Sequence, residues 1–525
     1  MSSKLEAIEI EGNYIEHDSI YDSNTALEKR FSLWSTIAFQ FSLICSSIAI
    51  GTYLSTVVGV GGSPFLIYGY ILAVGCDLVI CFSLAELASA YPHPSAQVHW
   101  TYCLAPKRLK KVMSFFVGIL SCAGWIFACF AVSYTTSMFI IALAEVYNPN
   151  YIPQDFHYYL IYVLLTTLGW AINVFGIALL PMINYILVFV INGGTLFIVI
   201  TLLVKANPKR SVEYVFLKVQ NETGWSSNGL VFFLGLLPSI ATVTFFDGAA
   251  HMTNEIPEPE KNIPLVMVIA NCFSAIAAFL AAIAYMYCIV NPDHMASPIG
   301  GQPIIQLMDD AFHSKALTTI GVLILIITFW GSYIGYACSG SRLVWSFANA
   351  GGLPFGKSYF GKLNTKLKVP VNSLNFITII TLILGTIIFG SSTALSAVLG
   401  SSMVCINLSY VFPIICMLWK SKFSLSPYVR FKSNEDNKEL SANLTIGKNL
   451  PYFCLGKLGL IMNTIAACWT FFIIIWLNFP IYDPVKTDNM NYACVVLGIT
   501  FIIAALLWFF HARKTFDHDI NSTHI

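Results

Sequence analysis

The stretch that decides the fold reads Thr244-Phe-Phe-Asp-Gly-Ala-Ala-His-Met-Thr-Asn-Glu-Ile-Pro257. It begins inside a run apolar enough to cross a membrane and ends in a polar, proline-bearing loop. Midway, Asp247 stands directly before Gly248. An acid and a helix-breaking glycine are both costly at membrane depth, so together they indicate a functional site. We therefore predict a membrane-spanning segment that is interrupted at Asp247 beside a binding site.

The composition is that of a polytopic membrane protein. Of the 525 residues, 57% are hydrophobic and 10% are charged, whereas a soluble protein is about 25% charged. A span needs roughly 20 mostly apolar residues, and helices are one of two structures that cross a bilayer. We predict an all-α fold with twelve spans. They cover residues 33–57, 65–91, 112–142, 158–180, 182–203, 230–249, 263–290, 317–345, 373–389, 394–419, 458–477 and 493–510.

The distribution of charge predicts how the chain is oriented. If the N-terminus is cytoplasmic, most of the 28 lysines and arginines fall in inside segments, as the positive-inside rule requires. Both termini are then cytoplasmic, and the loop over residues 205–229 is outside. The predicted divisions are a disordered tail over 1–30, a ten-span core over 31–419, a cytoplasmic loop over 420–457, two further spans over 458–511 and a cytoplasmic tail over 512–525.

The sequence carries no signature of an enzyme or of an ATP-driven pump. The phosphate-binding pattern G-x-x-x-x-G-K-[ST] is absent, and the cysteines lie mostly in apolar runs without zinc-ligand spacing. His93, His99 and His251 are not spaced with their neighbours like metal ligands or like the base of a nucleophile. We predict no catalytic residues, no metal, no cofactor and no nucleic-acid partner.

Three acidic residues lie within the predicted spans, namely Asp77, Glu86 and Asp247. Asp77 and Glu86 share one run but face opposite sides of a helix, so they are not an acid–base pair. For Glu86 the simplest interpretation is an interhelical hydrogen bond or a position at the membrane interface. For Asp77 a structural polar contact is favoured over a proton or cation relay.

Asp247 has two interpretations that the sequence leaves open. Its side chain could N-cap a short helix that begins at Gly248. It could instead be the counter-ion of a substrate ammonium, since Phe245 and Phe246 offer aromatic faces for cation–π contact. A helix broken here would also expose backbone ends that bind a zwitterion.

The expected partner of a broken sixth span is the first span, which crosses in the opposite direction. Its middle reads Cys45-Ser-Ser-Ile-Ala-Ile-Gly-Thr-Tyr53, a polar interruption of small residues. Such residues either line a site or allow helices to pack closely. Both interpretations stand for Ser46, Ser47 and Gly51.

Three stretches together resemble one known family. The first stretch is Ala85-Glu-Leu-Ala-Ser-Ala-Tyr-Pro92, followed by Ser95-Ala-Gln-Val-His-Trp100. The second runs from Phe246 to Pro257 and ends in Asn262-Ile-Pro264. The third consists of Ser341-Arg342, Gly351-Gly-Leu-Pro354 and Lys368-Val-Pro-Val-Asn372. Over roughly residues 30–515 the chain resembles the amino acid–polyamine–organocation superfamily, and within it the fungal amino acid/choline transporter family. It departs at Ala348-Asn-Ala-Gly351, where the family has Ala-Arg-Asp-Gly, and it lacks the fifth-span lysine of some proton-coupled relatives.

The resemblance implies a leucine-transporter-type fold. Spans 1–5 and 6–10 would form an inverted repeat, spans 11 and 12 would be peripheral, and substrate would bind midway between spans 1, 3, 6 and 8. The substrate-binding candidates that it implies are Ser46, Ser47, Gly51, Trp125, Phe245, Phe246, Asp247, Gly248 and Tyr333. The candidates for gating or structural contacts are Glu86, Glu255 and Arg342.

The predicted function is a plasma-membrane permease that imports a small amino-group or ammonium compound by alternating access. Choline, 4-aminobutyrate and amino acids are the first candidates, and a polyamine or a vitamin precursor is the alternative within the family. The resemblance implies a proton gradient as the driving force. A vacuolar membrane is the alternative location. A non-transporting nutrient sensor is the alternative from another class, although the short tails favour a transporter.

Overall fold

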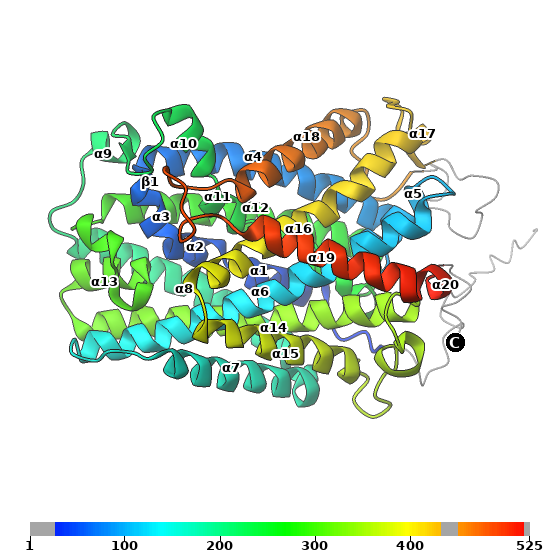
Figure 1. The fold of residues 1–525 in the computed structure, drawn as a ribbon, viewed down its shortest axis with the longest axis horizontal. Coiled ribbons are helices and arrows are strands. Elements are labelled where there is room, and N and C mark those ends of the chain that lie inside the picture. Colours follow the sequence, from blue (N-terminus) through cyan, green and yellow to red (C-terminus); the bar gives the residue numbers. More distant parts are fainter. Residues whose placement is uncertain (1–26, 432–449, 519–525) are drawn as a thin grey trace, which may run out of the picture.

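A computed structural model of the chain describes residues 27–431 and 450–518. Three predictions fall wholly or partly outside these residues: most of the tail over 1–30, the middle of the loop over 420–457 and the end of the tail over 512–525. The described chain forms a bundle of long helices that run along the longest axis of the molecule (Figure 1).

Eleven helices among the described residues are long and apolar enough to cross a membrane. This confirms a polytopic helical membrane protein, and each helix corresponds to one predicted span. The exception is the predicted sixth span, which contains a shorter apolar segment at Asn228–Ala241. The main helix of each span is α1 (Leu33–Ile44), α4 (Gly62–Ala90), α6 (Lys110–Tyr147), α7 (Asp155–Phe175), α8 (Leu180–Lys205), α12 (Pro259–Tyr287), α14 (Lys315–Asn349), α15 (Val371–Gly385), α16 (Ser392–Lys420), α18 (Leu458–Asn478) and α19 (Ala493–Leu507). Short elements next to α1, α8, α15 and α19 complete their spans, so that the first span covers Leu33–Gly59.

Short elements connect and extend these helices. The short α-helices are α2 (Ser46–Ala49), α3 (Leu54–Gly59), α5 (Gln97–Leu104), α9 (Val212–Phe216), α10 (Asn228–Leu234), α11 (Leu237–Ala241), α13 (Pro303–Phe312), α17 (Pro427–Phe431) and α20 (Arg513–Thr515). The 3₁₀ and π turns are η1 (Ile50–Tyr53), η2 (Ile177–Leu179), η3 (Gly248–Glu255), η4 (Asp293–Ala296), η5 (Ile299–Gly301), η6 (Gly356–Phe360), η7 (Thr386–Phe389) and η9 (Trp508–Ala512). Strand β1 (Val60–Gly61) pairs antiparallel with β2 (Gln220–Asn221).

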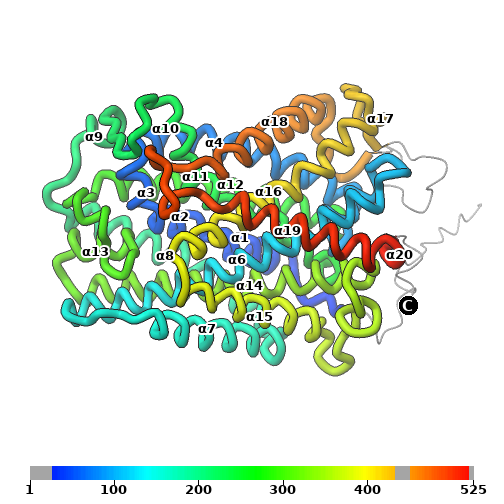
Figure 2. Tube along the Cα trace, viewed as in Figure 1, coloured from blue at the N-terminus to red at the C-terminus, as the bar shows by residue number. Residues whose placement is uncertain are grey.

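The two ends of the bundle differ in the elements that they carry (Figures 1 and 2). One end, here called the tail side, carries α5, α17, α20 and the end of the described chain. The opposite end, here called the loop side, carries α9, α10, α13 and β1. Residues at the start of the described chain also reach the tail side, since Phe31 N donates a hydrogen bond to Glu255 O at 3.2 Å.

The centre of the bundle is built around α6, which packs most extensively along α14 and α16. In the most apolar window of α6, 72% of the residues are buried, against 33% for α7 and for α8, 39% for α15 and for α18, and 17% for α19. Helix α19 is therefore the most exposed of the long helices, and α7, α8, α15 and α18 also lie toward the outside of the bundle.

Two segments are interrupted side by side in this interior. The chain leaves the helical path between α11 and η3, where Phe245 has φ 68°, a conformation that bulky residues rarely adopt. The path also breaks between α1 and α2, at Cys45 with φ 37°. Backbone groups freed inside a membrane must find partners within the protein. Gln40 supplies them, because its Nε2 donates to Phe245 O at 3.0 Å and its Oε1 accepts from Ala249 N at 2.9 Å.

Candidate binding site at the broken helices

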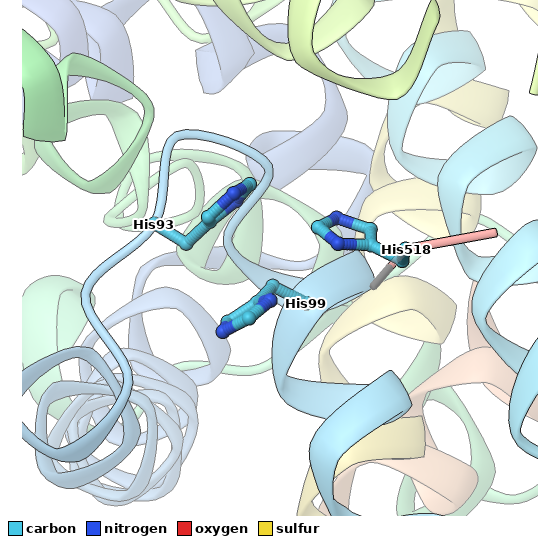
Figure 3. A group of neighbouring side chains, drawn as sticks. All are labelled: His93, His99 and His518. Atoms are coloured by element: carbon cyan, nitrogen blue, oxygen red, sulfur yellow. The ribbon is translucent and has the colours of Figure 1, made fainter. Parts of the chain in front are cut away.

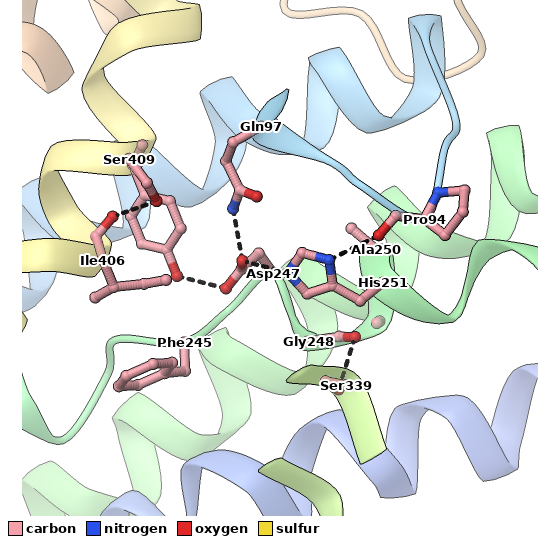
Figure 4. Close-up of polar contacts among 12 residues, drawn as sticks. Pro94, Gln97, Phe245, Asp247, Gly248, Ala250, His251, Ser339, Ile406 and Ser409 are labelled. Atoms are coloured by element: carbon pink, nitrogen blue, oxygen red, sulfur yellow. Dashed lines mark hydrogen bonds and ion pairs between the residues drawn. The ribbon is translucent and has the colours of Figure 1, made fainter. Parts of the chain in front are cut away.

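The Asp247 carboxylate lies at the interruption between α11 and η3 and is completely buried. Its Oδ2 accepts a hydrogen bond from Gln97 Nε2 at 2.5 Å and lies 3.0 Å from His251 Nε2, and its Oδ1 accepts from the Tyr410 hydroxyl at 2.5 Å (Figure 4). These donors come from α5, η3 and α16. A buried carboxylate is tolerated when it is paired and hydrogen-bonded, and here it joins three elements that are distant in sequence.

The side chain of Asp247 does not cap a helix. Asp247 does occupy the N-cap position of η3, but its carboxylate makes no capping hydrogen bond to the described backbone. Its backbone carbonyl accepts from Ala250 N at 2.8 Å. Of the two interpretations that the sequence left open, side-chain capping is therefore wrong, and the counter-ion interpretation stays a prediction.

An aromatic group stands beside this carboxylate, formed by Trp125 of α6, Phe245 and Tyr336 of α14, and is called the aromatic box below. The ring centroids of Trp125 and Phe245 are 5.1 Å apart, those of Phe245 and Tyr336 are 5.2 Å apart, and those of Trp125 and Tyr336 are 5.6 Å apart. Trp125 Nε1 is buried and has no hydrogen-bond partner in the described part of the chain. The Trp125 ring also lies 5.4 Å from that of His251.

The two phenylalanines before Asp247 point to different neighbours. Phe245 belongs to the aromatic box, whereas Phe246 stacks on Tyr410 with centroids 4.8 Å apart. Because the Tyr410 hydroxyl donates to Asp247, the Phe246 ring supports the residue that orients the carboxylate. Phe246 is thus not part of the aromatic box and packs against Tyr410 instead.

Gly248 allows the interrupted segment to approach α1. A Cβ atom at this position would lie 2.3 Å from Leu43 Cδ1 and 3.1 Å from Gln40 Oε1, so a side chain here would require Leu43 to shift. The Gly248 carbonyl accepts a hydrogen bond from Ser339 Oγ of α14 at 3.2 Å (Figure 4). The structure therefore brings together four of the predicted candidate residues, namely Trp125, Phe245, Asp247 and Gly248.

The serine candidates of the first span contact neighbouring helices. The Ser46 hydroxyl donates to the carbonyl of Thr242, at the interruption between α11 and η3, and accepts from Ser274 Oγ at 2.8 Å. Ser47 Oγ lies 2.8 Å from Thr195 Oγ1 of α8. Ser46 thus joins the two interruptions, whereas Ser47 faces away from Asp247 toward α8.

Two other candidates also contact elements away from Asp247. Gly51 packs against α13 on the loop side, where a Cβ atom would lie 2.3 Å from Ile304 Cδ1. The Tyr333 hydroxyl donates to Thr166 O of α7 at 3.1 Å. Neither residue joins the aromatic box in this structure, and the tyrosine of α14 that does so is Tyr336.

The three residues predicted for gating or structure form two buried ion pairs on the tail side. Arg342 Nε of α14 donates to Glu255 Oε1 at the end of η3, at 2.8 Å. Arg430 Nη2 of α17 donates to Glu86 Oε1 at 3.0 Å. Asp77, the remaining intramembrane acid, accepts from Trp469 Nε1 of α18 at 2.7 Å, a structural contact of the kind that was favoured for it.

Sequence reasoning missed several residues that complete the site: Gln40, Gln97, His251, Tyr336 and Tyr410. Gln97 lies within a stretch that carried the family resemblance, and His251 is one helical turn after Asp247, so both had a signal that could have been followed. Tyr336 and Tyr410 are aromatic residues in apolar runs, and nothing in their local sequence distinguishes them from core residues.

Comparison with known proteins identifies the family of the chain. Residues 31–501 match the family model described as amino acid permease. The choline transporter of Saccharomyces cerevisiae is 30% identical over 498 residues, which cover 94% of this chain and 84% of the relative. Amino-acid permease 2 of Neurospora crassa is 26% identical over 496 residues, covering 93% and 85%. The 7-keto 8-aminopelargonic acid transporter of S. cerevisiae is 24% identical over 545 residues, covering 93% of each chain.

These relatives are transporters, and their similarity extends over nearly the whole chain. The predicted class, a permease rather than an enzyme, is thereby confirmed. The match also spans both interruptions and all of the helices that surround Asp247. The chain belongs to the amino acid permease family of membrane transporters.

Proposed function

We propose that this permease moves a small ammonium compound across the membrane by alternating access, and that the compound binds between the aromatic box and Asp247. The observation that carries the proposal is the placement of three aromatic rings beside a buried carboxylate at two broken helices. Choline is the first candidate, supported by the relative of that name. An amino acid or 4-aminobutyrate is the second candidate, and a polyamine or vitamin precursor the third.

The chemistry of the site suits an ammonium group. A desolvated cation over an aromatic face gains about 2 kcal/mol, and a carboxylate adds charge attraction that is strong where water is excluded. In this structure the carboxylate is occupied by Gln97, His251 and Tyr410. Substrate binding would replace part of this hydrogen bonding with contact to the ammonium. Because Gln97 and Tyr410 belong to α5 and α16, binding would then change the contacts that these two helices make with Asp247.

We propose twelve spans, with the interrupted segment from α10 to η3 as the sixth and an inverted repeat over the first ten. The proposal is supported by the adjacent breaks in the first and sixth segments, and by the outer position of α19. The charge distribution supports a tail side that faces the cytoplasm. The plasma membrane is the proposed location.

A proton is the proposed coupling ion. The support is a buried pair of ionisable groups, with His251 Nε2 3.0 Å from Asp247 Oδ2 next to the aromatic box. Ionisable residues inside a membrane protein commonly form proton relays. A proton shared by this pair would change the charge that faces the substrate, and so couple proton movement to substrate binding.

The proposal is tested by uptake of labelled choline in yeast that lacks its own choline transport. Unlabelled choline, 4-aminobutyrate, spermidine and amino acids are added as competitors, together with the neutral analogue in which a tert-butyl group replaces trimethylammonium. We expect at least one ammonium compound to be transported and the neutral analogue not to compete. Equal competition by the neutral analogue would mean that the charge is not recognised.

The aromatic box is tested by a matched pair of variants at Tyr336. Tyr336→Phe keeps the ring and Tyr336→Leu removes it, while both keep an apolar side chain in a buried position. We expect Tyr336→Phe to transport with a KM near that of the wild type and Tyr336→Leu to show a KM raised roughly tenfold or more, the equivalent of about 1.4 kcal/mol. Equal KM values for the two variants would show that the Tyr336 ring takes no part in substrate binding.

A further inference from the structure

Three histidines gather on the tail side, away from the aromatic box. His93 follows α4, His99 lies in α5, and His518 lies three residues after α20 (Figure 3). One nitrogen from each ring lies within 4.8 Å of the others. His99 and His518 are 5% and 4% exposed, and His93 is half-buried. The sequence predicted no metal site because these residues are not regularly spaced, yet folding brings all three together.

The hydrogen bonding of the cluster is incomplete. Ser95 Oγ lies 2.8 Å from His93 Nδ1 and 2.8 Å from His518 Nε2. His99 Nδ1, in contrast, is buried without a hydrogen-bond partner among the described residues. Cys103, one turn further along α5, has its Sγ 3.5 Å from His99 Nε2. A buried nitrogen without a partner is costly, and an ion that accepted its lone pair would remove this cost.

We propose that His93, His99 and His518 bind a divalent transition-metal ion of the Zn²⁺ class, with the fourth tetrahedral position left to water. Imidazole nitrogen is a ligand that Zn²⁺ prefers. Zn–N bonds of about 2.0–2.1 Å place ligand nitrogens about 3.4 Å apart, so nitrogens that now lie within 4.8 Å of one another have to close by up to about 1.4 Å.

Metal binding requires the rings to turn. The His93 and His99 rings now stack with centroids 4.4 Å apart and an interplanar angle of 18°, so their in-plane lone pairs converge on one ion after rotation of the side chains. Ser95 Oγ is placed to accept the proton of a second ring nitrogen, as partners of metal-ligating histidines commonly do.

An acidic side chain lies next to the cluster. Asp517, whose carboxylate is held by Lys111 and Tyr102, adds negative charge next to the site.

The ion would join the end of the described chain to the segment that covers Asp247 on the tail side. His518 follows α20, whereas His93 and His99 flank the segment from Pro94 to Gln97. Pro94 O lies 2.9 Å from His251 Nδ1, and Gln97 donates to Asp247. A metal at the cluster therefore stabilises the tail-side closure by binding this folded arrangement and not an opened one.

The test uses the full-length protein, purified in detergent through a tag without histidine and stripped with a chelator. Zn²⁺ is titrated against a competing fluorescent chelator. We expect one tightly bound Zn²⁺ per molecule in the wild type, and at least a hundredfold weaker binding in His99→Gln and His518→Ala. His313→Asn, at an exposed histidine on the loop side, is the matched control and should bind Zn²⁺ as the wild type does.

His518→Ala keeps the test valid if His99→Gln disturbs α5, because His518 lies outside the long helices of the described chain. Wild-type protein without a tight Zn²⁺ site, or equal binding by wild type and His518→Ala, would overturn the proposal. Co²⁺ reports the ligands independently. Its visible spectrum should show the intense bands of a tetrahedral site in the wild type and lose them in His518→Ala, and a wild-type spectrum without these bands would contradict the proposal.

Discussion

The Asp247 carboxylate is positioned by residues from three elements, and this explains how an acid is tolerated at membrane depth. Gln97, His251 and Tyr410 each place a donor on it. Hydrogen bonds to a charged group are worth about 1.5–3 kcal/mol each, which offsets much of the cost of burying the charge. A site of this kind is rigid, and changes of one atom within it should have large effects.

The Asp247→Asn variant should lose uptake while it still reaches the membrane. Asparagine keeps the size of the side chain, but it removes the charge and turns one accepting oxygen into a donor that faces another donor. We expect uptake to fall at least a hundredfold, measured with labelled choline or the best substrate found, at equal surface levels of a fluorescent fusion. Asp77→Asn is the control, an equivalent change at a buried acid that contacts Trp469 of α18. Normal uptake kinetics in Asp247→Asn would exclude a role for the charge.

The Gly248→Ala variant should transport poorly because the new methyl group meets Leu43 Cδ1 at 2.3 Å. Overpacking of this kind costs about 1–3 kcal/mol, and here it would push η3 away from α1. The cause can be identified with the double variant Gly248→Ala/Leu43→Ala, in which the methyl group has room. We expect the double variant to recover uptake relative to Gly248→Ala. Additive losses in the two single variants and the double variant would contradict the steric explanation.

At the scale of elements, the tail-side end of the interrupted segment is fixed by an ion pair. Arg342 of α14 donates to Glu255 at the end of η3, and their side chains are 0% and 2% exposed. The backbone continues this contact, because Phe31 N donates to Glu255 O before α1 begins. One glutamate thus holds α14, η3 and the entry to α1 together. These are three of the elements that have to move apart if the tail side opens.

The Glu255→Gln variant should therefore be much less stable than a comparable change at the surface. Removing one partner of a buried ion pair costs about 3–5 kcal/mol. Glu258→Gln is the matched control, since Glu258 pairs with Lys261 at 62% and 42% exposure and such exposed pairs contribute about 0–1 kcal/mol. Thermal unfolding in detergent should show a clearly lower Tm for Glu255→Gln than for Glu258→Gln. Equal Tm values would show that the pair at Glu255 does not hold the closed arrangement.

At the scale of the whole molecule, the two sides of the bundle differ in how they are packed. On the tail side, Asp517 accepts from the Tyr102 hydroxyl at 2.6 Å and from Lys111 Nζ at 2.7 Å, and Asp517 N donates to Ala350 O at 2.9 Å. The end of the described chain is thereby joined to α5, the start of α6 and the residue after α14. On the loop side, a cavity of about 280 Å³ lies between α6, α7, η5 and α16.

Labelling of introduced cysteines should distinguish the two sides. Ser226 lies in an exposed loop on the loop side and Thr365 in an exposed loop that follows η6. In a background with the exposed Cys494 replaced by serine, we expect a membrane-impermeant maleimide to label Ser226→Cys in intact cells. Thr365→Cys should be labelled after permeabilisation alone. The reverse pattern would invert the proposed orientation.

The sequence by itself determined the features that depend on short stretches of chain. The length and polarity of each apolar run predicted eleven of the long helices, because the bilayer thickness sets the length of a span. The cost of an acid beside a glycine in such a run singled out Asp247. The prediction of a span over 230–249 was incomplete, because the residues after Ala241 leave the helix and their backbone groups are satisfied by Gln40 of another segment.

The tertiary structure alone decided which side chains meet. The family resemblance gave Tyr333 as a candidate, but the rotation of α14 places Tyr336 in the aromatic box and turns Tyr333 toward α7. Rotation of a buried helix cannot be read from a run that is apolar on every face. Tyr410 reaches Asp247 across 163 residues and His518 reaches Ser95 across 423. Contacts over such separations are fixed by packing of whole helices, and local sequence carries no record of them.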